Sequence, residues 1–282
     1  MYPKKLYKYK KFDKYTCKML RNGELFLCSA KKLDDQFDCA VNIIHDKYKN
    51  MDDEEMKKLS VEIAKEQMSN YYHIDGKLID ENIELINKFG SSFKDLFELK
   101  FNETPDSINN VEEIFDTITN FQKKIGVGSL ATSKTNQVLW KMYANNYKGF
   151  CIEYEMPKNM KNLHKVSYGK NKNNDILETF LRYVVLAIYS KFFGIKNEVP
   201  FEDEIKKLTL IKFKEWSFQK EWRFIGEPGK YVYLKIKAVY LGNNISKKHE
   251  EKILTIAKKK KFKVYKSYND YKDLKIKFNR VL

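Results

Sequence analysis

The sequence predicts an α+β protein, in which a mostly antiparallel sheet core is interrupted by a helical insertion. Segments with strand-like alternation of apolar residues stand near the start of the chain and recur in its second half. Helical periodicity dominates the stretch between them, and no internal repeat or long linker divides the chain. We therefore expect a core domain of residues 1–44 and 125–282 and a helical insertion of residues 45–124.

The first part of the core is predicted to contain a strand, a helix and a second strand. LYKYKKF alternates apolar and basic residues as a strand does. KYTCKMLRNG predicts a helix that ends at Gly23. ELFLCSA predicts the second strand, and LDDQFD after it predicts an acidic turn.

Helical patterns fill the insertion, in DEEMKKLSVEIAKEQM, DENIELINKFGSSFKDLFELK and NNVEEIFDTITNFQKK. GVGSLATSK then predicts a strand, QVLWKMYANNYKG a short amphipathic helix and FCIEYE another strand. Two further helices are expected before residue 216, in DILETFLRYVVLAIYSKFFG and EDEIKKLTLIKFK.

WSFQKEWRFI, residues 216–225, predicts a strand with two unlike faces. One face carries Trp216, Phe218, Trp222 and Phe224, and the other carries Ser217, Gln219, Glu221 and Arg223. The tail predicts a strand, a strand, a helix and a strand, in YVYLKIK, AVYLG, SKKHEEKILTIAKKK and FKVYKSY.

The composition predicts a globular cytoplasmic protein. Its 43% hydrophobic and 15% aromatic residues can supply a core. The most apolar helix candidate, YVVLAIYSKFFG, is short and contains a lysine, and no apolar secretory segment follows the basic N-terminus, so we expect no membrane partner. The four cysteines form no CxxC pair and lack neighbouring histidines, so we expect reduced thiols.

The charge favours an anionic partner. The formal net charge is +16, from 54 Lys and Arg against 38 Asp and Glu. Such a field attracts a polyanion, a nucleotide phosphate or an acidic protein. The alternative is that abundant lysine is a habit of composition. No recognised nucleic-acid motif accompanies the charge, so nucleic acid stands as a candidate partner, and the oligomeric state is not indicated.

Three segments combine polar side chains with strand character: Lys8 to Lys10, Ser129 to Ser133, and Gln219 to Arg223. Each stands beside aromatic residues, which are Tyr7 and Tyr9, Trp140 and Tyr143, and Trp216 and Trp222. A cleft with aromatic walls and a few polar groups suits a planar ligand. We therefore expect a nucleotide ligand at these segments.

The chain resembles the bacterial domain-of-unknown-function family 2971. The residues that carry the resemblance are LYKYKKF, KMLRNGELFLCSA, LDDQFDC, GSLATSK, VLWKMYANNYKGFCIEYE, WSFQKEWRFI and AVYLGNNIS. Residues 45–124 do not contribute to it.

The same three polar segments resemble, in the same order, the arginine-serine-glutamate pattern of ADP-ribosyltransferases. The resemblance implies a substrate, NAD, whose phosphate or ribose contacts the basic position, Lys10. It implies that Ser129 supports the nicotinamide pocket and that Glu221 is catalytic. Lys10 departs from the pattern, which expects the bidentate fork of arginine, and SLATS departs from Ser-Thr-Ser.

The chemistry implied by the resemblance is transfer of ADP-ribose, with nucleic acid as a candidate acceptor in a toxin or phage-defence setting. Glu221 would stabilise an oxocarbenium-like centre, and Gln219 would orient the acceptor. The nicotinamide side would be shaped by Ser129, Trp140 and Tyr143, and Tyr9 is a further candidate for binding the cofactor. Arg223 would either contact phosphate or form an ion pair with Glu221 or Asp38, and we favour the ion pair.

Three other interpretations stay open. Asp34, Asp35 and Asp38 could join Glu221 to bind a divalent metal, as in a metal-dependent nuclease, although such turns commonly cap helices or brace loops. The aromatic cleft could hold a nucleotide in a non-catalytic sensor module. The polar face of residues 217–223 could also meet solvent on an edge strand, where Glu221 would pair with a lysine.

Overall fold

The computed structural model describes residues 2–33, 35, 38–39, 53–73, 77, 120, 122–158, 160–169, 182, 194 and 206–282. The chain divides into two compact units. Unit 1 comprises Met1–Leu33, Lys124–Lys172 and Leu210–Leu282, and unit 2 comprises Asp34–Lys123 and Asn173–Thr209. The helical insertion predicted from the sequence falls almost wholly in unit 2, which also takes in residues 173–209.

In unit 2, the structure describes one long helix, α3 (Asp53–Tyr72), where DEEMKKLSVEIAKEQM predicts it. The helix predicted in DENIELINKFGSSFKDLFELK lies outside the described residues, as do most residues of the helices predicted in NNVEEIFDTITNFQKK and DILETFLRYVVLAIYSKFFG. Of these two, residues 120, 122–123 and 182 are described and are helical, as predicted.

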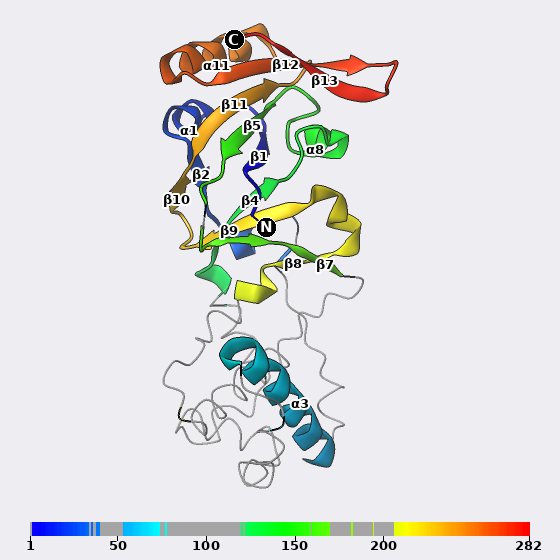
Figure 1. The fold of residues 1–282 in the computed structure, drawn as a ribbon. Coiled ribbons are helices and arrows are strands. Elements are labelled where there is room, and N and C mark those ends of the chain that lie inside the picture. The colour runs from blue at the N-terminus through cyan, green and yellow to red at the C-terminus, as the bar shows by residue number, and fades with distance from the viewer. Residues whose placement is uncertain are drawn as a thin grey trace. The chain divides into compact units, whose positions relative to one another are not determined.

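Unit 1 is built on a nine-stranded sheet with the order β13-β12-β11-β5-β1-β4-β9-β6, to which β3 is added beside β4 (Figure 1). Its strands are β1 (Lys5–Lys10), β3 (Cys28–Ser29), β4 (Gly126–Ala131), β5 (Phe150–Glu155), β6 (Leu163–Lys165), β9 (Glu221–Gly226), β11 (Lys235–Leu241), β12 (Lys263–Asp270) and β13 (Lys275–Arg280). Two small sheets pair β2 (Glu24–Phe26) with β10 (Tyr231–Tyr233), and β7 (Ser167–Gly169) with β8 (Ile211–Phe213).

The predicted α+β class is confirmed, and the large sheet is mixed. Most described neighbours pair antiparallel, as predicted, but β11 and β12 are parallel. A parallel pair needs a crossover between its strands, which α11 (Lys247–Lys260) supplies. The other helices of unit 1 are α1 (Thr16–Asn22), α8 (Gln137–Met142) and two short 3₁₀ helices, η1 (Ala30–Lys32) and η3 (Lys214–Gln219).

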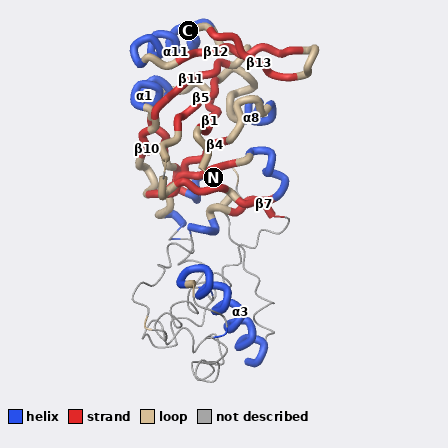
Figure 2. Tube along the Cα trace, in the orientation of Figure 1, coloured by secondary structure: helices blue, strands red, loops and turns tan. Residues whose placement is uncertain are grey.

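Each face of the large sheet packs its own hydrophobic cluster. One cluster combines the sheet with residues of α1 and α11, such as Leu20 and Ile253. The other combines it with α8, through Leu139 and Trp140. Figure 2 shows these helices beside the strands of unit 1. We call the two sides of the sheet the α1–α11 face and the α8 face.

The predicted strand WSFQKEWRFI is only half correct. Residues Lys214–Gln219 form η3, Lys220 follows with a left-handed φ of 44°, and β9 begins at Glu221. From there the predicted alternation holds: Glu221 and Arg223 are buried on one face, and Phe224 packs in the cluster of the other. Because β9 lies between β4 and β6, its polar side chains are not on a solvent-facing edge strand.

Other predicted elements fall close to their expected places. The helix of KYTCKMLRNG ends at Gly23, whose φ is 68°, as predicted. Ile211–Phe213 forms β8, however, and not the end of a helix. Strands β6, β7 and β13 were not predicted. Within the described residues, no helix is long and apolar enough to cross a membrane.

Candidate functional site

The three polar segments of the sequence lie on three consecutive strands of the sheet, β1, β4 and β9. Ser129 lies opposite Arg223, and Ala131 lies opposite both Tyr7 and Glu221. Directly opposed residues point to the same side of a sheet. Since Ala131 belongs to the cluster of the α8 face, Glu221, Arg223 and Ser129 lie on that face as well. Segments far apart in sequence therefore contribute to one polar network.

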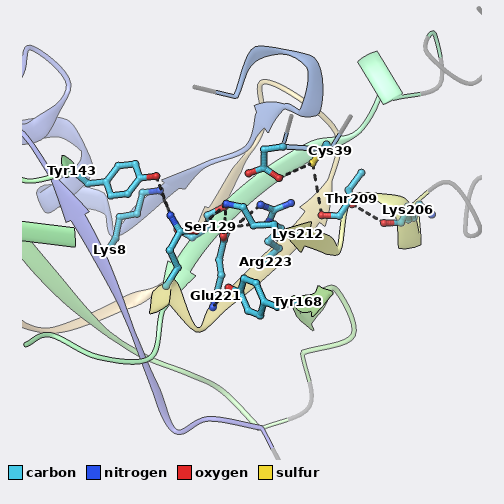
Figure 3. A network of polar contacts seen from close by, with 12 residues as sticks. Lys8, Cys39, Ser129, Tyr143, Tyr168, Lys206, Thr209, Lys212, Glu221 and Arg223 are labelled. Atoms are coloured by element: carbon cyan, nitrogen blue, oxygen red, sulfur yellow. Dashed lines mark hydrogen bonds and ion pairs between the residues drawn. The ribbon is translucent and has the colours of Figure 1, made fainter. Parts of the chain in front are cut away.

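Glu221 stands at the centre of this network (Figure 3). Its Oε1 accepts a hydrogen bond of 2.8 Å from Arg223 Nε, and its Oε2 accepts one of 3.1 Å from Lys212 Nζ. The side chain of Ser129 donates a further hydrogen bond to the carboxylate. The side chain of Arg223 is completely buried, and those of Lys212 and Glu221 are each 6% exposed. Among the described residues, these three form a buried ion triad, with two cations around one carboxylate.

The triad keeps Glu221 ionised. Burial alone raises the pKa of this carboxyl group, because a charge loses its hydration. The opposing effects are the charges of Arg223 and Lys212 and the hydrogen bonds from Arg223 and Ser129. Together they outweigh burial, so the pKa of Glu221 lies below its ordinary value of 4.5. Glu221 is therefore a carboxylate at neutral pH.

Gln219 is fixed by the same network. Its Oε1 accepts from Lys212 Nζ at 2.8 Å, and its Nε2 donates to the Tyr143 hydroxyl at 3.1 Å. Because an ammonium group can only donate, the Gln219 amide must be oriented with its oxygen toward Lys212. The amide nitrogen of Gln219 is thus directed toward Tyr143, the most exposed member of this group.

Lys212 and Tyr168 are parts of the network that sequence reasoning missed. Lys212 lies on β8, in a stretch predicted as helix, and its Nζ lies 5.4 Å from the centroid of the Trp216 ring. Tyr168 lies on β7, and its hydroxyl accepts a hydrogen bond of 2.8 Å from the backbone N–H of Glu221. No sequence motif marks either residue, since both depend on the parallel pairing of β7 with β8.

The basic residue of β1 that reaches this region is Lys8. Its Nζ donates to the backbone oxygen of Ser129 at 3.0 Å. Lys10, which the resemblance placed in the basic position, instead forms an ion pair of 2.9 Å with Asp13. Both lysines belong to the predicted segment Lys8 to Lys10. The segment does contact the site, but through Lys8 and not through Lys10.

Of the three aromatic residues predicted to bind the cofactor, only Tyr143 forms a hydrogen bond to the network. Tyr9 donates to the Ser133 backbone oxygen at 2.8 Å, and its ring meets Trp140 edge-on, with centroids 5.4 Å apart. Trp140 is completely buried, and its Nε1 donates to the Lys134 backbone oxygen. Tyr9 and Trp140 therefore pack the hydrophobic cluster of the α8 face.

The acidic turn belongs to unit 2. Asp38 Oδ1 lies 3.6 Å from Cys39 Sγ, and Asp34 lies outside the described residues. Among the residues that the structure does describe, no three His, Cys, Asp or Glu side chains are grouped as metal ligands. The metal site of Asp35 and Asp38 stays a prediction.

Unit 1 is thus an α+β sheet domain with a buried polar network, to which β4 and β9 of the large sheet, the small β7–β8 sheet and η3 contribute. Residues 139–224 match the family model DUF2971, described as a protein of unknown function. The predicted resemblance to this family is confirmed over those residues, which include Tyr143, Tyr168, Lys212, Gln219 and Glu221. No curated protein and no solved structure matches the chain.

Proposed function

We propose that the protein is an NAD-dependent ADP-ribosyltransferase with Glu221 as its catalytic residue. One observation supports the proposal above the others. The basic, serine and glutamate segments of the resemblance occupy adjacent strands β1, β4 and β9, and the side chain of Ser129 contacts Glu221. A single NAD molecule needs these three segments in one place.

In the proposed reaction, the bond between nicotinamide and the ribose breaks, and nicotinamide leaves with the bonding electrons. An acceptor nucleophile then bonds to the ribose carbon and releases its proton. Glu221, held ionised, stabilises the positive charge that develops on the ribose. Gln219, whose amide is fixed by Lys212, orients the acceptor. The basic role passes from Lys10 to Lys8, and the acceptor is a nucleic acid in a toxin or phage-defence setting.

The burial of Glu221 sets a condition on this reaction. Its side chain is 6% exposed and both of its oxygens accept hydrogen bonds from cations. We therefore expect that NAD reaches the carboxylate when the Lys212 ammonium, which contacts Glu221 Oε2, moves aside. The phosphates of NAD are a suitable alternative partner for the Lys212 ammonium.

The test is transfer of label from radioactive NAD to macromolecules of a cell lysate. We expect the wild type to label a macromolecule and Glu221→Gln to abolish labelling. Ser129→Ala removes one hydrogen bond from Glu221 without leaving a cation unpaired, so it should reduce labelling about tenfold or less. The matched control is Glu155→Gln, which removes an exposed carboxylate of the same sheet. Equal labelling by folded Glu221→Gln and wild type would contradict the catalytic assignment.

The second candidate function is a nucleotide-binding sensor without catalysis. The observation that favours it is that Arg223 and Lys212 already occupy both oxygens of Glu221. This candidate predicts that NAD or ADP-ribose raises the melting temperature while no label is transferred. It fails if label is transferred, or if neither nucleotide changes the melting temperature. No observation in the described residues favours the nuclease.

A further inference from the structure

Positive charge is concentrated at the C-terminal end of the chain. Residues 246–282 contain thirteen Lys and Arg against four Asp and Glu, which gives them +9 of the net +16. They form α11, β12 and β13, which we call the C-terminal module and which lie together at one end of unit 1 (Figure 1). The preceding 245 residues share the other +7.

The carboxylates of the C-terminal module neutralise little of this charge. Glu250 pairs with Lys266 at 2.7 Å, and both Asp270 and Asp273 pair with Lys277. Three of the four acids therefore pair with only two lysines. The module retains ten exposed lysines that form no ion pair within the described part of the chain: Lys247, Lys248, Lys252, Lys258, Lys259, Lys260, Lys261, Lys263, Lys272 and Lys275.

The lysines of α11 are directed outward. Ile253, Ile256 and Ala257 are buried against the α1–α11 face of the sheet, which leaves the opposite side of the helix to solvent. Lys248, Lys252 and Lys259 are spaced so that they share a helix face. At 1.5 Å per residue they form a row roughly 16 Å long. A row of this length can contact several successive phosphates.

Exposed tyrosines accompany the lysines on the β12–β13 hairpin. Tyr271, in the turn between the strands, is 81% exposed and is followed by Lys272. Tyr268 is 40% exposed and lies opposite Lys277. An exposed tyrosine ring is a surface on which an unpaired base can stack.

We propose that the C-terminal module binds single-stranded nucleic acid, with its lysines on the phosphates and Tyr271 and Tyr268 on the bases. Lysine supplies the phosphate contacts of non-specific binding, and stacking favours unpaired over paired bases. A membrane surface fits less well, because an interfacial helix needs a free apolar face and that of α11 is buried. The inference does not depend on the proposed transferase activity.

The test is fluorescence anisotropy of the full chain with a labelled oligonucleotide of about 20 nucleotides, a length typical of several binding sites of this kind. We expect binding that weakens as salt is raised, with a logarithmic slope of about −0.7 for each phosphate contact. Neutralising Lys248, Lys252 and Lys259 together to Gln should reduce the size of that slope by about 2 and weaken binding at least about tenfold. Tyr271→Ser should weaken binding about fivefold or more.

A matched control removes the same charge elsewhere in unit 1. Lys158, Lys161 and Lys165 are exposed and lie outside the module, and the triple change to Gln should weaken binding about threefold or less, through the loss of general charge. Thermal unfolding of each variant establishes that it is folded. The proposal is overturned if both triple variants lose equal affinity, if Tyr271→Ser binds as the wild type does, or if anionic vesicles bind the chain and the oligonucleotide does not. Since no assay contains NAD, failure here leaves the transferase proposal standing.

Discussion

At Glu221, burial raises the pKa of the carboxyl group and ion pairing lowers it. The ion pairs prevail, so the group is charged, but its charge also balances those of the buried Arg223 and Lys212. Removing one member of a buried ion cluster deprives the remaining buried charges of a partner, which costs more than the pair itself contributes. The carboxylate assigned to catalysis is therefore also important for folding.

We expect Glu221→Gln to lower the free energy of unfolding by about 3 kcal/mol or more near neutral pH. The pKa of Glu221 is lower in the folded chain than in the unfolded chain. The stability that the ionised carboxylate contributes is therefore present above pH 4.5, the ordinary pKa, and is lost as the pH falls through the pKa of the folded state. The difference between wild type and variant should therefore shrink below about pH 4.5. Urea unfolding over a pH series measures it.

Glu227→Gln is the control, because Glu227 is 79% exposed in its pair with Lys230. It should change stability little at any pH. A difference for Glu221→Gln that stays constant from neutral to acid pH would show that the ionised carboxylate is not the source of the effect.

For individual residues, the sequence predicted those that belong to a recognisable motif. Gln219 and Glu221 belong to a recognisable triplet, and Ser129 to a serine-containing strand, and the three do meet. Lys212 lies in a lysine-rich stretch with nothing to distinguish it from its neighbours. Its role depends on where β8 lies, which is a tertiary property.

Among the elements, η3 and β9 show how one sequence pattern can fit two structures. The aromatic residues Trp216 and Phe218 alternate as in a strand, yet Lys214–Gln219 is a 3₁₀ helix. It ends at Lys220, whose backbone N–H donates to the Ser217 oxygen and whose left-handed conformation is one that alternation cannot reveal. Similarly, the apolar spacing of LTLIKF fits a helix, but Ile211–Phe213 pairs with β7.

The end of α1 offers a test of a predicted element. Gly23 is left-handed, and a Cβ atom there would lie 2.1 Å from the backbone oxygen of Leu234. Gly229 is also left-handed, with φ of 81°, but a Cβ atom there would meet nothing within 4 Å. We expect Gly229→Ala to cost about 1 kcal/mol, the cost of the conformation, and Gly23→Ala to cost clearly more.

Urea unfolding of the two variants gives the comparison directly, since both replace a left-handed glycine by alanine. The excess cost of Gly23→Ala is the cost of moving the backbone at Leu234. If both variants lose the same free energy of unfolding, the backbone at Leu234 can move away from the added Cβ atom without destabilising the fold.

For the whole molecule, charge is the dominant feature. The net charge of +16 makes the folded chain repel itself, and exposed ion pairs such as Glu227–Lys230 and Glu155–Lys235 contribute little. The sequence established this charge and the α+β class. It did not establish that β11 and β12 are parallel, because a connection as long as α11 can join strands of either orientation.

Raising the concentration of potassium chloride from about 10 mM to about 150 mM should raise the melting temperature, because salt shortens the range of repulsion between like charges. Calorimetry over a salt series measures this change. A melting temperature that falls with salt would mean that attractive pairs, and not repulsion, dominate the electrostatic free energy of the fold.

The contact between Lys212 and Trp216 gives the buried network an optical property. The Lys212 ammonium lies 5.4 Å from the centroid of the indole ring, and the same ammonium holds Gln219 and Glu221. A charge so close to an indole shifts the energy of its excited state. The emission wavelength of Trp216 therefore depends on the position of the Lys212 ammonium. Trp216 is thus an intrinsic fluorescent probe of whether Lys212 remains bound to Gln219 and Glu221.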